Sequence, residues 1–130
     1  MITTTYPWQD KETPVLPGEE WKAHPTNGFE FSTLGRMRNP RTGGLLGHLA
    51  VRGPGAGRRR SVPNKPYVSA RTWVSGQRAT LYAHSGVLET FVGPRPDNHD
   101  ADHINHDRLD NRISNLRWRP APENRADNRP

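Results

Sequence analysis

The chain has 130 residues, of which 31% are hydrophobic, and it contains 12 glycines and 13 prolines. This size and composition suit one compact domain or two very small modules and exclude a large apolar core. A bound metal ion, an ordered polar loop network or a polyanionic partner would each add stability, and composition does not choose among them. No cysteine is present, which excludes disulfides, thiolate zinc fingers and cysteine nucleophiles, so a metal site must use His, Asp, Glu, Asn or backbone oxygen.

Membrane insertion is not expected, because no apolar run approaches the roughly 18 residues of a span. The N-terminal residues Met1-Ile-Thr-Thr-Thr lack a charged-then-apolar signal pattern. We therefore expect a soluble, cytoplasmic protein.

The positive charge is concentrated in the middle of the chain. Residues 31–88 contain ten Lys or Arg and no Asp or Glu, whereas the whole chain has a net charge of +6. The ten are Arg36, Arg38, Arg41, Arg52, Arg58, Arg59, Arg60, Lys65, Arg71 and Arg78. A solvated loop face that keeps the protein soluble is one interpretation. Ten cations without one acid favour the other, a surface that binds the phosphates of nucleic acid.

The N-terminal half is expected to contain little regular structure. Residues 1–18 are rich in Thr and Pro and predict an arm that is flexible or packed at the periphery. Alternating apolar residues in 29–38 predict a short strand or hairpin that buries Phe29, Phe31, Leu34 and Met37. Residues 39–66 are rich in Gly, Pro and Arg and predict a long loop that becomes ordered on DNA.

A hairpin and a helix are expected next. Residues 67–74 and 79–82 alternate around Gly76, which marks a turn. Residues 84–92 place Val87, Leu88 and Phe91 at helical spacing, and Gly93-Pro94 closes this helix.

The C-terminal segment has a recognisable motif. It reads, from residue 100 to 124, DADHINHDRLDNRISNLRWRPAPEN. From residue 102 onward it closely resembles the HNH motif of phage- and intron-encoded homing-type endonucleases. In that family a strand ends in Asp/Asn-His, an Asn-rich loop follows, and an Asn-Leu-x-Trp strand leads into a helix entered through Pro-x-Glu-Asn. The resemblance extends more weakly over residues 19–126, because Glu20-Trp21-Lys22 with 29–38, and 82–91, look like upstream segments of these nucleases.

The resemblance implies an α+β fold in which short β-hairpins and a basic loop precede a small ββα-metal (HNH, or His-Me finger) motif. It predicts three parts: an arm at 1–18, a nuclease-associated module with the basic DNA-binding loop at 19–66, and the nuclease domain at 67–130. The implied function is hydrolysis of phosphodiester bonds in double-stranded DNA by a phage or mobile-element enzyme, located in the cytoplasm of a bacterial host.

The site is expected around His103. A histidine with an ordinary pKa near 6.5 can accept a proton from water, and the family assigns its motif histidine the role of general base. The resemblance implies that Asp102 and Asn124 bind one Mg²⁺ or Mn²⁺. In a regular strand Asp102 and His103 point to opposite sides, so a bend or helix contact must bring them to one phosphate. Asn115 is expected to bond the loop backbone and to hold the His103 ring.

Other motif residues are assigned structural or DNA-binding roles. Asp107, Asp110 and Asn111 are expected to close the loop through bonds to the backbone. The residues expected in a small core beneath it are Ile104, Leu109, Ile113, Leu116 and Trp118. The DNA-binding prediction adds Arg117 to the basic residues, and His84 is either a DNA contact or a packing residue.

Two positions depart from the family pattern. Asn105-His106 replaces a common Asp-Gly, and both residue types tolerate a left-handed backbone, so the turn can survive. Pro120 replaces a common Thr or Ser and removes a helix-capping oxygen, so metal binding would help to order the short final helix.

Three alternatives stay open. The His99, His103 and His106 spacing fits a structural zinc cluster. The chain could be an inactive DNA-binding module, or a phage packaging or degradative nuclease with the same catalytic residues. One site per chain cuts one strand, so a monomer would nick DNA and a weak homodimer could break both strands.

Overall fold

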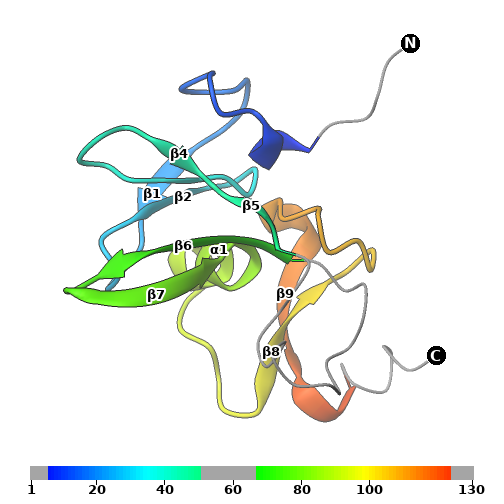
Figure 1. Ribbon diagram of the computed structural model, residues 1–130. Helices are drawn as coiled ribbons and strands as arrows, with labels where there is room; N and C mark the ends of the chain where they lie inside the picture. Colours follow the sequence, from blue (N-terminus) through cyan, green and yellow to red (C-terminus); the bar gives the residue numbers. More distant parts are fainter. Residues whose placement is uncertain (1–5, 51–66, 124–130) are drawn as a thin grey trace.

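The computed structural model describes residues 6–50 and 67–123, in which three small antiparallel sheets surround one helix (Figure 1). The predicted DNA contacts Arg52, Arg58, Arg59, Arg60 and Lys65 and the predicted metal ligand Asn124 lie outside these residues. Within the described ranges, no helix is both long enough and apolar enough to cross a bilayer.

The first sheet has the strand order β1 (Trp21–Ala23), β2 (Glu30–Ser32), β3 (Met37–Arg38) and β4 (Leu45–Leu46). The predicted hairpin in 29–38 is confirmed, because β2 and β3 pair antiparallel around a tight turn. Phe29, Phe31 and Met37 are buried as expected, and Leu34 is half-buried.

The second sheet has the order β5 (His48–Ala50), β6 (Tyr67–Val74) and β7 (Gln77–Tyr82). The predicted 67–82 hairpin is confirmed, and its two turn residues, Ser75 and Gly76, both have positive φ, as a tight two-residue hairpin turn requires. The prediction of a loop throughout 39–66 is wrong for β4 and β5. These short strands take their hydrogen bonds from β3 and β6, which local composition cannot reveal.

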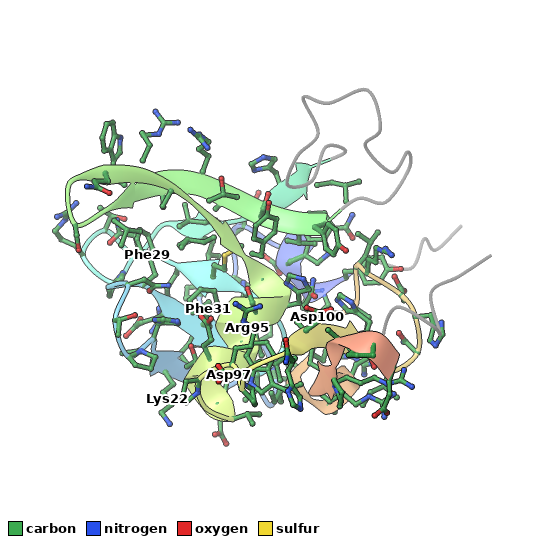
Figure 2. The ribbon with its side chains drawn as sticks, turned by 90° about the horizontal axis from the view of Figure 1, so that it is seen from below. Lys22, Phe29, Phe31, Arg95, Asp97 and Asp100 are labelled. Carbon is green, nitrogen blue, oxygen red and sulfur yellow. The ribbon has the colours of Figure 1, made fainter. Side chains whose placement is uncertain are left out.

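Helix α1 (Ala83–Phe91) confirms the helix predicted at 84–92. It lies at the centre of the molecule and contacts strands of all three sheets. Gly86 allows the closest approach, because a Cβ there would lie 2.2 Å from Cε2 of Phe31. Figure 2 shows Phe29 and Phe31 on the first sheet, next to this helix.

The third sheet pairs β8 (His99–His103) with β9 (Leu116–Pro120), as the motif predicts. A 3₁₀ turn, η2 (Ile113–Asn115), leads into β9, and residues 121–123 begin a helix directly after Pro120. Leu116 is buried and Leu109, Ile113 and Trp118 pack on the core, but Ile104 is 46% exposed, so its place in the predicted small core is wrong.

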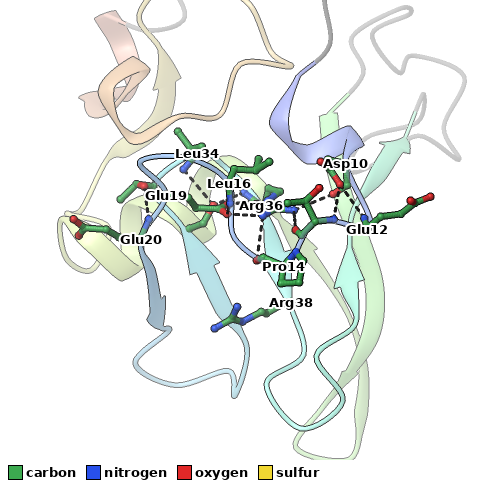
Figure 3. Close-up of polar contacts among 12 residues, drawn as sticks. Asp10, Glu12, Pro14, Leu16, Glu19, Glu20, Leu34, Arg36 and Arg38 are labelled. Atoms are coloured by element: carbon green, nitrogen blue, oxygen red, sulfur yellow. Dashed lines mark hydrogen bonds and ion pairs between the residues drawn. The ribbon is translucent and has the colours of Figure 1, made fainter.

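The N-terminal segment is packed on the first sheet rather than flexible over residues 6–18. A 3₁₀ turn, η1 (Pro7–Gln9), buries Trp8, and the Tyr6 hydroxyl donates to Asp107 Oδ2 at 2.7 Å. The buried Arg36 guanidinium donates to the carbonyls of Asp10 (3.1 Å) and Thr13 (2.8 Å), as Figure 3 shows. Composition does not predict this packing, because backbone carbonyls make the contacts.

Candidate active site

The third sheet places Asp102 and His103 on opposite sides of β8, as expected for a regular strand. Asp102 pairs with Arg117 and His103 pairs with Leu116. Both side chains are nevertheless buried, each with 7% of the residue exposed. Both faces of β8 are therefore covered at these two residues.

The His103 ring is fixed by an amide. His103 Nε2 lies 2.7 Å from Asn111 Oδ1, and a carboxamide oxygen only accepts hydrogen bonds. Nε2 therefore carries the proton, and Nδ1 is the nitrogen that can accept one. Burial lowers the pKa of His103, and the Asn111 bond opposes this shift without cancelling it. The ring is consequently neutral near pH 7, as a general base must be.

His84, at the start of α1, stacks on His103 with ring centroids 5.5 Å apart and planes 18° apart. The Ser85 amide donates to its Nδ1 at 2.8 Å. Burial, with Arg108 and His103 nearby, lowers the pKa of His84 to about 3, so His84 is an uncharged partner. The His84 ring packs on His103, and a DNA contact by His84 stays a prediction.

Asp102 is held by arginines of β9. Arg117 Nε donates to Asp102 Oδ2 at 2.7 Å, and Arg119 Nη1 lies 4.0 Å from the same oxygen. Arg117, predicted as a DNA contact, therefore has an acidic partner within the chain, although 47% of its side chain is exposed. Both of these described contacts are made to Oδ2.

Asn115 stabilises the loop rather than the ring. Its Oδ1 accepts from the Asn105 amide at 3.0 Å, and its Nδ2 donates to the Asp110 carbonyl at 2.9 Å. The expected bond to the loop backbone is thus present, but the contact with His103 is made by Asn111. The sequence does not show which of Asn111 and Asn115 contacts the His103 ring, because both lie in one polar segment.

The expected bonds to the loop backbone are present for Asp107 and for Asp110, whose Oδ1 accepts from the Arg112 amide at 3.4 Å, but the described side-chain bond of Asn111 goes to His103. Asp107 Oδ1 accepts from the Leu109 amide at 3.0 Å, and Asp110 Oδ2 accepts from Asn105 Nδ2 at 3.0 Å. His106 has a φ of 67°, so it takes the left-handed position of the turn. The departure from Asp-Gly is therefore tolerated.

The zinc alternative does not fit the structure. His99, His103 and His106 are all described, and in the described part of the chain no three His, Asp or Glu side chains are grouped to hold a metal ion. His99 Nδ1 contacts the Asp97 carbonyl at 2.8 Å, and His106 is exposed.

Some arginines of the basic block are paired within the fold, and others are exposed to solvent. Arg36 is 1% exposed and paired with the buried Glu19, so its prediction as a DNA contact is wrong. Arg38 pairs with Glu30 at 2.6 Å and stacks on Trp21 at 4.1 Å, so it too is engaged within the fold. Arg41 and Arg71 are exposed.

One face of the β6–β7 hairpin carries cations and an exposed aromatic ring. Arg71 and Arg78 are exposed there, and the Arg78 guanidinium lies 5.2 Å from the centroid of the Trp73 ring, which is 59% exposed. We call Arg71, Trp73 and Arg78 the hairpin face. At the other end of the hairpin, the ring centroids of Tyr67 and His84 lie 5.1 Å apart. The sequence did not single out Trp73, because an alternating pattern does not say which aromatic ring faces solvent.

His84 also lines an open pocket. Its lining residues are Tyr67, His84, Ser85, Glu89, Arg95, Asp100, Ala101 and Trp118. Figure 2 shows Arg95 on the connection from α1 and Asp100 on β8. Two carboxylates in this lining, those of Glu89 and Asp100, disfavour a phosphate there.

Comparison with known proteins agrees with the motif. Residues 81–130 match a family described as HNH endonuclease. A solved structure of the HNH homing endonuclease I-HmuI, described as one of DNA binding and cleavage, is similar with a TM-score of 0.62 and 19% sequence identity. The match covers 83% of this chain and 56% of that chain, so this chain spans little more than half the length of I-HmuI. At this identity the likeness shows a shared fold. No curated protein sequence matches the chain significantly.

Proposed function

We propose that this chain, whose residues 81–130 match a family described as HNH endonuclease, is a metal-dependent endonuclease that nicks duplex DNA, encoded by a phage or mobile element. The observation that carries the proposal is the geometry of His103. It is a buried, neutral imidazole whose Nε2 is bonded to Asn111 and whose Nδ1 can accept a proton.

In this proposal His103 is the general base. Its Nδ1 takes a proton from the water that attacks the phosphorus atom, while the bond from Nε2 to Asn111 keeps the ring oriented. The stacked His84 stays neutral, because burial lowers its pKa, and so it does not repel the imidazolium that forms. Asn115 acts indirectly by holding the loop that carries Asn111.

One divalent ion, Mg²⁺ or Mn²⁺, fits the donor set that we propose. Asp102 offers a hard carboxylate oxygen, as these cations prefer, and the described contacts of Arg117 and Arg119 are made to its Oδ2. Asn124 is the second proposed ligand. When bound, the ion would polarise the phosphate and stabilise the departing 3′ oxygen. Arg117 keeps the Asp102 carboxylate aligned through its hydrogen bond to Oδ2.

The DNA would lie over the hairpin face toward His84 and His103. Arg71 and Arg78 supply positive charge without a carboxylate partner among the described residues. Phosphate contacts of this kind fix the position of a duplex without reading its sequence. Arg41, Arg117 and the basic residues 52–65 are further proposed contacts, and we expect modest sequence preference. The enzyme would act as a monomer or a weak homodimer.

A plasmid assay tests the proposal. Supercoiled plasmid should be converted to the open circular form with Mg²⁺ or Mn²⁺ and not with a chelator present. His103→Ala should lower the nicking rate at least about a hundredfold while DNA binding is retained. His99→Ala is the matched control, because His99 lies on the same strand and the described hydrogen bond of its ring is with the Asp97 carbonyl; its rate should be unchanged. DNA binding by the wild type without nicking would instead identify a DNA-binding module.

A further inference from the structure

The turn between β2 and β3 contacts the loop that carries the His103 partner. Gly35 in this turn lies so close to Asn111 that a Cβ on Gly35 would be 2.7 Å from the Asn111 carbonyl oxygen and 2.8 Å from its Cβ. The Thr33 carbonyl accepts a hydrogen bond from the Ile113 amide at 2.9 Å. The turn thus holds the loop at two points, on either side of Arg112.

The turn itself is firmly built. Ser32 is fully buried, and its hydroxyl accepts from the amides of Leu34 (3.2 Å) and Arg36 (3.0 Å). The Arg36 side chain, 1% exposed, anchors the end of the turn against Glu19. The turn is therefore a rigid support and not a compliant loop.

Asn111 depends on that support. It is 3% exposed, and its Nδ2 has no hydrogen-bond partner within the described part of the chain. The described hydrogen bonds of its side chain consist of the 2.7 Å contact with His103 Nε2. Packing against Gly35 must therefore set where the amide oxygen lies.

We propose that the turn at residues 33–36 positions His103 for catalysis, acting through Asn111. Gly35 and Asn111 are positioning residues: they fix the proton on Nε2 and direct Nδ1 outward. The N-terminal sheet is in this way part of the catalytic apparatus. The inference rests on the base role of His103 proposed above.

Gly35→Ala is the direct test, and Gly28→Ala is its control. Both glycines have a left-handed backbone, with φ of 86° and 81°, so alanine is strained equally at each. A Cβ at Gly28 meets no atom within 4 Å, whereas one at Gly35 displaces Asn111. Only Gly35→Ala should lower kcat, by about ten- to a hundredfold, with little change in KM, because a small misplacement of a catalytic group is costly.

A second readout does not depend on cleavage. Nitrogen-15 imidazole spectra of the metal-free protein, with the His103 signal identified by its loss in His103→Ala, should show one protonated nitrogen, Nε2. Gly35→Ala and Asn111→Ala should give a mixture of tautomers. Asn111→Asp keeps an acceptor oxygen and should restore the single tautomer with Nε2 protonated. Gly28→Ala keeps the wild-type contact and should also show that single tautomer. If Gly35→Ala does not fold, Gly35→Asn places a Cβ at the same point with less backbone strain.

The outcomes separate the two proposals. An altered tautomer in Gly35→Ala, with no nicking by any variant or the wild type, would support the positioning contact and overturn the nuclease assignment. A nicking wild type, with kcat and tautomer in Gly35→Ala equal to those of Gly28→Ala, would overturn the positioning role alone.

Discussion

Arg36 belongs to the strongly basic block of residues 31–88, but its own side chain is buried. Its Nε donates to Glu19 Oε2 at 2.8 Å, and its other nitrogens bind backbone carbonyls of the N-terminal segment. Burial raises the pKa of Glu19, but its bonds with Arg36 outweigh this and the net shift is downward. The pair therefore stays charged and connects residues 10–19 with β3.

Removing this guanidinium should be costly. In Arg36→Met the Glu19 carboxylate remains buried without its partner, which typically costs about 3–5 kcal/mol of folding free energy. Arg38→Met is the comparison, because the Arg38–Glu30 pair is half-buried at the surface and should cost about 1 kcal/mol or less. Urea unfolding of the three proteins measures the difference. Equal midpoints for the two variants would contradict the structural role assigned to Arg36.

At the residue scale, the sequence predicted which residues gather at the site better than which of them contact one another. The Asp102-His103 pair and the loop-closing role of Asn115 followed from the motif, since local spacing carries them. The contacts of His103 with Asn111 and His84, and of Asn111 with Gly35, join segments distant in sequence. Nothing in local residue patterns specifies such contacts, so the ring partner was assigned to the wrong asparagine.

At the element scale, the β6–β7 hairpin carries two exposed arginines and an exposed tryptophan. Arg71 and Arg78 lie on it with the ring of Trp73 between them in sequence. Its existence was predictable from alternation around Gly76. Strands β4 and β5 were not, because their pairing is supplied by β3 and β6 and not by their own residues.

Among the described residues, those of the hairpin face should contribute most to the salt dependence of DNA binding. Arg71→Ala with Arg78→Ala should weaken binding to random-sequence duplex and reduce the slope of log K against log salt by about two, one for each lost phosphate contact. Arg38→Ala is the control, because its charge is satisfied by Glu30. Binding measured at several salt concentrations decides this; slopes that match the wild type in the double variant would place the DNA elsewhere.

At the scale of the whole molecule, one core joins the segments that the sequence divides at residue 66. Phe31 and Met37 from the first sheet pack in the same cluster as Val87 and Leu88 of α1 and Leu116 of β9. The ring of Phe31 fills the space above Gly86. The C-terminal motif therefore shares its apolar core with the N-terminal sheet.

This shared core predicts a single unfolding transition. Tryptophan fluorescence and far-ultraviolet circular dichroism should give coincident urea curves, as for a two-state domain of this size. Residues 67–130 expressed alone should show no dispersed amide spectrum, because α1 loses the cover of Phe31. Two separated transitions, or a folded spectrum from that fragment, would show instead that the C-terminal part is stable by itself.

The exposure of Trp73 gives the molecule an internal optical probe. Trp8 is 7% exposed, whereas Trp73 is 59% exposed and lies on the hairpin face. A duplex bound there would stack against or shield that indole, so its emission would report occupancy without an attached dye. The same ring would become inaccessible to a soluble quencher, and titrations could be followed on the unmodified protein.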